Sequence, residues 1–266
     1  MSTQPTTLFL SHGGGPLPLL GDPGHREMVT TLKQIAGELS KPKAILLISA
    51  HWEATLPTIT ASPKPGLIYD YYGFPEESYH IQYPSPGEPQ LAGKILQALR
   101  KSGIAAQMDD QRGFDHGMFV PLTILYPQAD IPCVQLSLVN SMSAEQHLQI
   151  GRALRSLQHE GLLVIGSGFS FHNLPAFFSA ADASSTNKNL QFEAWLIETC
   201  SAPQLSEEQR YQRLLEWHKA PYARYCHPRE EHLLPLHVCY GLNSRAADQQ
   251  FHPTILGKKS SFFLWR

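Results

Sequence analysis

Histidine is the residue type best placed to do chemistry in this chain. The 266-residue sequence contains 13 histidines, and several of them lie in glycine-rich or apolar segments where a solvated surface histidine is not expected. A neutral imidazole is the commonest metal ligand in proteins, and it also gains and loses a proton near neutral pH. The positions of these histidines therefore decide what kind of site the chain can build.

Two histidines directly follow expected β-strands. His12 precedes three glycines and a proline, and glycines allow positive φ and a close approach of the backbone to a ligand. His51 ends an apolar run and is followed by Trp52 and Glu53. Each histidine has two interpretations. His12 is either a metal ligand or part of a tight turn, and His51 is either a metal ligand or a core residue that packs beside Trp52. Glu53 either accepts a hydrogen bond that orients His51 or forms a surface salt bridge.

Two more histidines lie next to apolar segments. His116 stands at an expected loop-to-helix junction, where it can point into a pocket and bind a substrate oxygen. The alternative is that Asp115 caps the helix and His116 has no role. His172 follows a strand and two aromatic residues. It can transfer protons beside a metal, or it can be a loop histidine that binds backbone groups.

Residues 227–237 contain three histidines. The zinc-protease pattern His-Glu-x-x-His is absent. On a helix, His232 and His237 would lie roughly 140° apart, so they are poor joint ligands. One histidine of this segment is expected to join the site, and spacing leaves the choice among His227, His232 and His237 open. The chain also lacks a nucleophilic serine or cysteine motif and a nucleotide loop, which favours a histidine-bound metal with water-accessible positions.

The sequence around these residues predicts an α/β fold, because short apolar runs alternate with amphipathic segments. We expect a central mixed or mostly parallel sheet flanked by helices. Strands are expected at 7–11, 44–50, 105–108, 131–138, 162–166 and 260–265, and helices at 25–39, 89–102, 119–126, 144–158, 190–200 and 206–217. Ser143 and Gln146 form a capping-box pattern, and residues 66–84 are expected to form a long ordered loop. Ligands bind beyond the carboxyl ends of such strands, so His12, His51 and His172 can converge there.

Composition excludes several functional classes. The net charge is −2 without a basic stripe, so nucleic acid is not an expected partner. No segment reaches the roughly 18 apolar residues of a membrane span, and the first residues lack signal-peptide features. Four separated cysteines without a Cys-x-x-Cys pair are typical of a reduced, cytoplasmic protein. The length fits a single domain over residues 1–266, as a monomer or small homo-oligomer.

Six segments together resemble one known family. In chain order they are SHGGGP at 11–16, ISAHWE at 48–53, YDYYGFPEESYHIQYPSPG at 69–87, FDHGMFVPL at 114–122, GSGFSFHNL at 166–174 and HPREEHLLPLHV at 227–238. In these segments the chain is similar to the DODA-type extradiol aromatic ring-opening dioxygenases, of the class III superfamily that includes protocatechuate 4,5-dioxygenase. The resemblance spans nearly the whole chain, and it is strongest to bacterial 4,5-DOPA dioxygenases.

The resemblance implies a role for each of five histidines. His12, His51 and His232 match the family's metal-binding positions. His172 matches the acid/base histidine, which lies close enough to the metal to be a possible additional ligand. His116 matches a histidine that binds the substrate hydroxyls. Tyrosine and phenylalanine residues of 69–74 would line the pocket.

The metal that the resemblance implies depends on the third ligand. Better-known members of the superfamily use two histidines and a glutamate, the facial triad of non-haem Fe(II) oxygenases. Here the third position is His232, and a shift of one residue would aim the neighbouring Glu231 elsewhere. Three imidazoles also suit zinc. We therefore expect Fe(II) as the working metal and Zn(II) as the ion found in purified protein.

The implied reaction is the extradiol opening of a catechol, such as 4,5-cleavage of L-DOPA, with O2 at the histidine-bound metal. The partners would be a small aromatic diol and O2, and no Arg or Lys of the sequence can be assigned to a substrate carboxylate. Two alternatives remain. A zinc-dependent hydrolase could use the same three histidines, and a non-catalytic metal-binding or interaction protein would have little use for an acid/base residue at His172.

Overall fold

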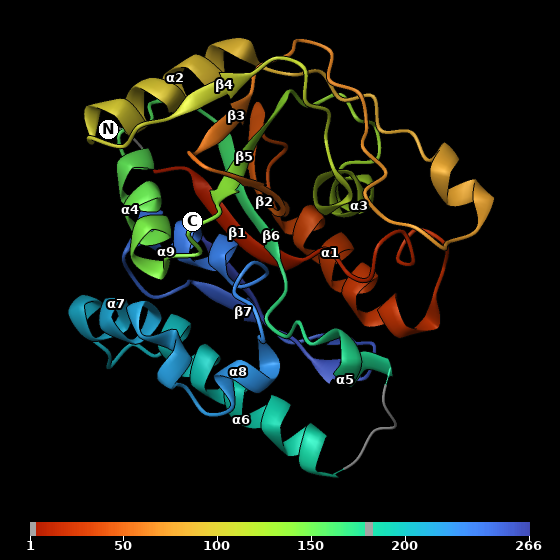
Figure 1. Ribbon diagram of the computed structural model, residues 1–266, viewed down its shortest axis with the longest axis vertical. Coiled ribbons are helices and arrows are strands. Elements are labelled where there is room, and N and C mark those ends of the chain that lie inside the picture. Colours follow the sequence, from red (N-terminus) through yellow and green to blue (C-terminus); the bar gives the residue numbers. More distant parts are fainter. Residues whose placement is uncertain (1–3, 179–182) are drawn as a thin grey trace.

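The computed structural model describes residues 4–178 and 183–266 (Figure 1). The strands are β1 (Thr6–Ser11), β2 (Ala44–Ala54), β3 (Thr58–Thr60), β4 (Gln107–Asp109), β5 (Cys133–Val139), β6 (Leu162–Gly168), β7 (Gln249–Phe251), β8 (Thr254–Ile255), β9 (Lys258–Lys259) and β10 (Phe262–Trp265). The α-helices are α1 (Arg26–Glu38), α2 (Pro89–Lys101), α3 (His116–Leu125), α4 (Ala144–Leu154), α5 (Leu174–Phe178), α6 (Ala183–Ser201), α7 (Glu207–Leu215), α8 (Ala223–Cys226) and α9 (Leu234–Asn243). Short 3-10 helices are η1 (Pro23–His25), η2 (Glu76–His80) and η3 (Trp217–Lys219).

The strands of the described residues form one large mixed sheet and a small two-stranded ladder of β8 and β9. The order in the large sheet is β4-β3-β5-β2-β6-β1-β10-β7. Its centre, β5-β2-β6-β1, is parallel, whereas β10 pairs antiparallel with β1 and β7. At the other edge β3 is antiparallel to β5 and parallel to β4. This confirms the predicted α/β fold with a mixed sheet.

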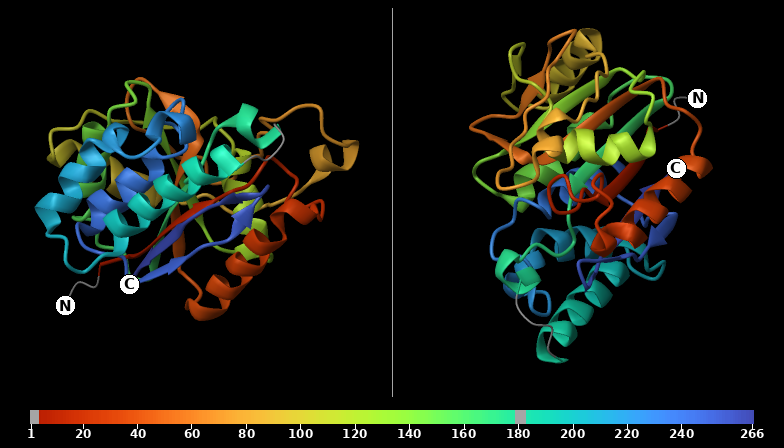
Figure 2. Two further views of the ribbon diagram at one scale, coloured as in Figure 1. Left: turned by 90° about the horizontal axis from the view of Figure 1, so that it is seen from below. Right: turned by 90° about the vertical axis from the view of Figure 1, so that its right-hand side faces the viewer.

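Helices cover both faces of the sheet, and the side chains of the central strands alternate between the two faces. Helices α1 and α3 lie over one face (Figure 2, right). Ile45 and Leu47 of β2 join the core on that side. Leu46 and Ile48 join the second core, with residues of α2, α4 and α9. Strands buried on both faces read as continuous apolar runs, which is why the sequence predicts them.

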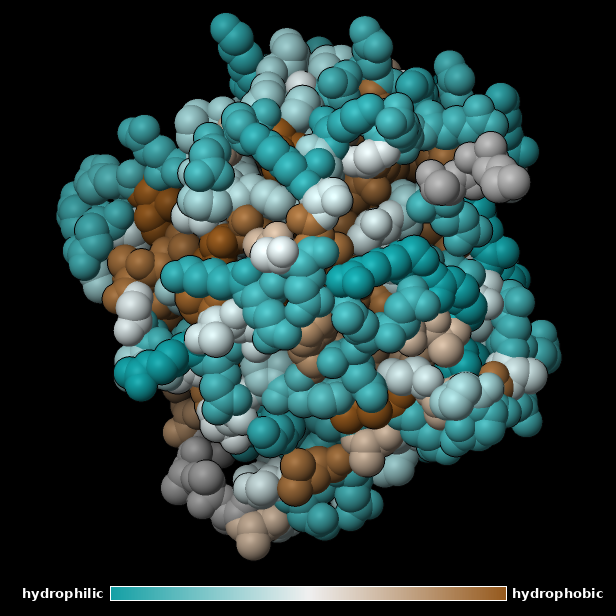
Figure 3. Space-filling model, turned by 180° about the vertical axis from the view of Figure 1, so that it is seen from behind, coloured by the Kyte–Doolittle hydropathy of each residue, from teal (hydrophilic) through white to brown (hydrophobic). Residues whose placement is uncertain are grey.

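Most large apolar side chains are buried in these two cores. On the face seen in Figure 3, hydrophilic side chains predominate and hydrophobic ones gather toward one edge. Among the described residues, the most exposed large apolar side chains are Tyr72, Phe178 and Leu174, at 92%, 87% and 54%. Of the helices in the described part of the chain, none has the length and apolar character that a membrane span requires.

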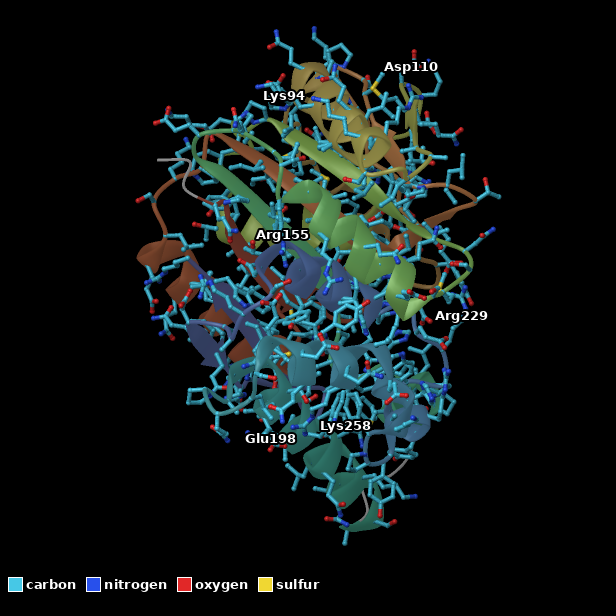
Figure 4. The ribbon with its side chains drawn as sticks, turned by 90° about the vertical axis from the view of Figure 1, so that its left-hand side faces the viewer. Lys94, Asp110, Arg155, Glu198, Arg229 and Lys258 are labelled. Carbon is cyan, nitrogen blue, oxygen red and sulfur yellow. The ribbon has the colours of Figure 1, made fainter. Side chains whose placement is uncertain are left out.

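Helix α9 is the largest element that the sequence pattern does not predict. Each of its residues is buried, so it shows no polar face and no amphipathic period. Pro235 stands in its first turn, where a missing N–H costs nothing. The Nε of Arg155 donates to the carbonyls of Gly241 and Leu242 near its end, and the arginine lies beside α9 in Figure 4.

The boundaries of two helices differ from the predictions by three or four residues. Helix α3 begins at His116 rather than at 119, and α4 ends at Leu154 rather than at 158. Ser143 caps α4 as predicted, but the Gln146 side chain accepts from Ser141 instead of closing a capping box. A complete capping box occurs at the start of α7. The 66–84 segment is mostly irregular, with η2 as its one 3-10 helix among the described residues.

Candidate metal centre

His12 directly follows β1, as predicted. Strand β1 pairs in parallel with β6, and Ser11 lies beside Gly168. The Nδ1 of His12 is 3.1 Å from the Ser167 hydroxyl. Because that hydroxyl donates its only proton to the Gly117 carbonyl, it accepts from the His12 Nδ1–H. The Nε2 of His12 is left with the lone pair, as a metal ligand requires.

His51 lies inside β2 rather than after it, because the strand continues to Ala54. The register of β2 against β5 shifts between Ile48 and Glu53. Irregularities of this kind bend a strand and redirect a side chain, and they are common next to active sites. The shift therefore turns His51 toward the end of β1 although the chain remains extended.

The nitrogens of His51 face two different groups. Its Nε2 is 2.9 Å from the Nε2 of His12, and its Nδ1 is 3.5 Å from a carboxylate oxygen of Asp70. Glu53 does not orient this ring. Both Glu53 oxygens accept from Arg229, at 2.5 and 2.6 Å, so the salt-bridge alternative holds, and this pair ties β2 to the 227–233 segment.

His116 is the first residue of α3, and Asp70 holds it. The backbone N–H and the Nδ1 of His116 donate to the same Asp70 oxygen, at 2.9 and 2.8 Å. The alternative that Asp115 caps the helix with its side chain is wrong, because the buried carboxylate accepts from Ser49 instead. Sequence reasoning missed Asp70. The only available signal was an acidic residue among aromatic ones in the 69–74 segment.

His172 and His232 are brought together by backbone contacts between two loops. The N–H of Phe169 donates to the His232 carbonyl, and that of His172 to the Cys226 carbonyl, both at 2.9 Å. A Cβ at Gly168 would lie 2.1 Å from the His232 carbonyl oxygen. Only glycine at this position lets the two loops approach, so Gly168 indirectly places both histidines.

Glu231 bridges the Nδ1 atoms of these two rings. One of its oxygens is 3.0 Å from the Nδ1 of His172 and 3.1 Å from the Nδ1 of His232. The two imidazoles stack with centroids 3.4 Å apart. The expectation that Glu231 points elsewhere is wrong because residues 227–233 form turns before α9, where neighbouring side chains need not be 100° apart.

Distance from His12 and His51 leaves both His116 and His232 available as the third metal ligand. The ligand atoms of His12, His51 and His116 all lie within 4.8 Å of one another, and so do those of His172, Glu231 and His232. The ring centroid of His232 is 5.2 Å from that of His12 and 5.0 Å from that of His51. The corresponding distances for His116 are 5.3 and 3.9 Å.

The electrostatics favour neutral imidazoles beside charged carboxylates. Burial, assisted by the neighbouring rings, lowers the pKa of His12, His51 and His232 well below the ordinary value. Burial works to raise the pKa of Asp70, but its hydrogen bonds with His116 outweigh this and lower that pKa. Neutral histidines with their lone pairs available are the form that binds a metal.

The other two histidines of the 227–237 segment are structural. The Nε2 of His227 binds the Ser170 carbonyl at 2.8 Å. His237 lies on α9, and its two nitrogens bind the carbonyls of Leu233 and Leu214. Of the three candidates that spacing left open, His232 alone reaches the cluster.

The clustered histidines line one cavity of about 400 Å³. This size is typical of a small-molecule site. Tyr71 and Phe74 contribute to the wall, as expected for the 69–74 segment, whereas Tyr72 is not among the lining residues. The full set of described lining residues is His12, Gly13, Gly14, Gly15, Leu17, His51, Tyr71, Phe74, His116, Phe169, His172, Leu174, Phe177, Phe178, His232 and Leu256.

The donor set fits a divalent transition metal. His12, His51, His116 and His232 each turn Nδ1 toward a hydroxyl or carboxylate, which leaves Nε2 for the cavity side. Such outer partners are the usual support of metal-ligating histidines. The 2.9 Å approach of two Nε2 atoms is a contact that a shared ion would satisfy. Imidazole ligands suit zinc, iron, copper and nickel, so the donors do not identify the metal.

Comparison with known proteins agrees with this chemistry. Residues 6–261 match the family described as the catalytic LigB subunit of aromatic ring-opening dioxygenase. The dioxygenase tasH of Hapsidospora irregularis is 44% identical over 248 residues, which cover 88% of this chain and 76% of that protein. The 4,5-DOPA dioxygenase extradiol of Beta vulgaris is 37% identical over 246 residues, covering 90% of this chain and 88% of its own.

A solved structure and a bacterial relative extend the comparison. The crystal structure of an uncharacterized protein from Escherichia coli K12 has a TM-score of 0.73 at 28% identity, and covers 99% of this chain and 100% of that chain. The 4,5-DOPA dioxygenase extradiol of Escherichia coli K12 is 38% identical over 174 residues, 65% of this chain and 62% of that protein. The prediction that the resemblance is strongest to bacterial 4,5-DOPA dioxygenases is therefore confirmed only in part, since fungal and plant relatives match over longer segments. The chain belongs to the LigB family of aromatic ring-opening dioxygenases, and it is an oxidoreductase of that type.

Proposed function

We propose that this protein is an extradiol ring-cleaving dioxygenase that opens a catechol with O2 at a histidine-bound non-haem metal. The observation that carries the proposal is the convergence of five histidines on one cavity, with a carboxylate or hydroxyl behind each candidate ligand. The four cysteines are buried and unpaired, which supports a reducing, cytoplasmic location. We further propose that residues 1–266 form one catalytic domain.

His12, His51 and His232 are the proposed metal ligands. His12 and His51 already approach each other through Nε2. A carboxylate holds the Nδ1 of both remaining candidates, Glu231 at His232 and Asp70 at His116. His232 is preferred because it occupies the position that matches the family's third ligand. His116 then keeps its Nε2 for the substrate. When bound, the metal would acidify the catechol hydroxyls and offer a position for O2.

His172 is the proposed acid/base residue. It lines the cavity, and its Nδ1 is held by Glu231 at 3.0 Å. That contact fixes the ring and leaves Nε2 to take the proton of a catechol hydroxyl. The same nitrogen returns the proton as the ring opens. His116 donates through Nδ1 to Asp70, so its Nε2 lone pair can accept a hydrogen bond from the second substrate hydroxyl.

Fe(II) is the proposed working metal, and Zn(II) is the ion expected in protein purified in air. Zinc binds nitrogen ligands more tightly than Fe(II) does. Metal analysis after anaerobic and aerobic purification tests this pair of expectations. Activity restored by zinc alone would contradict the role of iron.

Oxygen consumption tests the proposed reaction directly. The metal-free protein is loaded anaerobically with Fe(II), given a panel of catechols that includes L-DOPA, and followed for O2 uptake and a yellow ring-opened product. The zinc-loaded protein is the matched control. If no catechol consumes O2 while the zinc-loaded protein hydrolyses an ester or amide, the hydrolase alternative replaces this proposal. Metal binding without either activity would favour the non-catalytic alternative.

A further inference from the structure

The cavity wall beyond the histidines is apolar. Leu174, Phe177 and Phe178 of α5 contribute to it, and so do Leu17 and Leu256 from loops near β1 and β8. The hydroxyl of Tyr71 donates to the Ser78 carbonyl at 2.6 Å. Tyr71 therefore presents its ring rather than a free hydroxyl to the cavity.

The described part of this wall carries no Lys, Arg, Asp or Glu side chain. Residues 179–182, which follow α5 in the chain, include neither Lys nor Arg in the sequence. The nearby Arg229 is paired with Glu53, and the carboxylates of Asp70 and Glu231 face histidine rings. A carboxylate on a substrate would lose its water there without gaining a cation, which is costly.

Two apolar side chains of the wall are largely open to solvent. Phe178 is 87% exposed and Leu174 is 54% exposed, although both line the cavity. An exposed apolar surface at the mouth of a pocket is an unfavourable contact with water that an apolar ligand removes. It offers nothing to a charged group.

We propose that the substrate of this enzyme is a catechol that carries an uncharged apolar substituent, packed against Leu174, Phe177 and Phe178, rather than a catecholic amino acid. This inference rests on the proposed ring-cleaving function, and it narrows the substrate class of the same site. The diol lies at the histidines, and the substituent lies along α5. Each methylene that becomes buried there strengthens binding by roughly fourfold.

Binding of two matched catechols tests the proposal without turnover. The zinc-loaded protein is titrated calorimetrically, without O2, with 4-(3-methylbutyl)catechol and with 3-(3,4-dihydroxyphenyl)propionate, whose side chains have the same shape but differ in charge. We expect the neutral compound to bind at least about tenfold more tightly. L-DOPA should bind as weakly as the propionate or more weakly. Equal or tighter binding of L-DOPA or the propionate overturns the proposal, as does a failure of both compounds to bind.

A charge placed in the wall should change this preference. The Phe178→Arg variant puts a guanidinium at the cavity mouth, where Phe178 is too exposed to be needed for folding. We expect the affinity ratio of the neutral compound to the propionate to fall by roughly three- to tenfold. Tyr72→Arg is the matched control, because it adds the same charge at a 92% exposed residue outside the cavity. An equal change in both variants overturns the assignment of the wall.

The outcomes separate this inference from the function on which it rests. The Fe(II)-loaded protein is assayed for O2 uptake with the same compounds. If the binding preference is found and no catechol consumes O2, the proposed reaction fails and the apolar site stands. If catechols are cleaved with L-DOPA preferred, the reaction stands and this inference fails.

Discussion

Two groups of buried or half-buried histidines in this protein look alike until their hydrogen-bond partners are compared. The site histidines are His12, His51, His116, His172 and His232, and the core histidines are His147, His227 and His237. Burial lowers the pKa of His12, His51 and His232, but it also lowers the pKa of His147 to about 4 and of His227 to about 3. A depressed pKa therefore does not distinguish the two groups.

The difference lies in what the ring nitrogens face. His147 binds the Ser143 carbonyl through Nδ1 and accepts from the Val139 N–H through Nε2. His237 likewise binds two backbone groups. His147 and His237 thus join one piece of backbone to another, whereas His227 binds the Ser170 carbonyl through Nε2 and has no hydrogen-bond partner on its buried Nδ1 among the described residues. A site histidine has an outer partner on Nδ1 and another ring or the cavity on Nε2, so one nitrogen is left for a ligand.

The largest expected effect is the loss of the metal, and it should separate a site histidine from a core histidine within the 227–237 segment. We expect His232→Ala to lose its bound metal and all measurable ring cleavage, because a ligand is removed. His237→Ala should keep its metal at temperatures where it is folded, since this ring faces only backbone carbonyls. Metal content after dialysis measures both. His116→Ala is the sharpest comparison, and if it rather than His232→Ala loses the metal, His116 is the third ligand.

A second prediction separates metal binding from proton transfer within the site histidines. We expect His172→Ala to retain its metal and to lose roughly 10²- to 10⁴-fold in turnover, the usual contribution of an acid/base group. Metal analysis and kcat on the same preparation provide the measurement. Loss of the metal would make His172 a ligand, and unchanged turnover would refute its role.

The outer carboxylates should have a smaller effect than the rings that they hold. Glu231 contacts the Nδ1 of both His172 and His232. We expect Glu231→Gln to weaken metal affinity or activity by roughly 10- to 100-fold. Competition with a chelator measures the affinity. Glu230→Gln is a control at the adjacent residue, whose carboxylate pairs with Arg224 outside the cavity, and an equal loss there would contradict the assignment.

The smallest predicted effect is a change of folding stability with pH, to which both the site and the core histidines contribute. A histidine whose pKa is lowered in the folded state takes up a proton more readily when unfolded, so its stabilising contribution is present above pH 6.5 and is lost as the pH falls below it. Between pH 6.5 and its folded-state pKa, each such residue lowers the free energy of unfolding by up to about 1.4 kcal/mol for every pH unit that the pH falls. Urea unfolding of the metal-free protein should therefore show falling stability from pH 7 to pH 5. His147→Gln should flatten this slope, and an unchanged slope would show that His147 does not take part.

Much of the fold follows from local pattern. The strands at the centre of the sheet read as apolar runs because they are buried on both faces, and α1 and α2 show an amphipathic period because one face meets the core. Helix α9 has no such period since all of its residues are buried. The three-residue strands β3 and β7 are too short to leave a pattern. These are limits of local information, and only packing against the rest of the chain defines such elements.

Local composition was enough to predict that histidines follow the strands β1 and β6 and that one lies at the end of an apolar run in β2, because strand ends and glycine-rich turns have recognisable residue patterns. Which other residues contact these histidines depends on how distant segments pack. Asp70 reaches His116 across 46 residues, and the carbonyl of His232 rests on Gly168. The tertiary structure also decided that Glu231 faces the site, because turns rather than a helix precede α9. Hydrogen bonds and close backbone contacts between distant segments depend on the packed fold, and no local period records them.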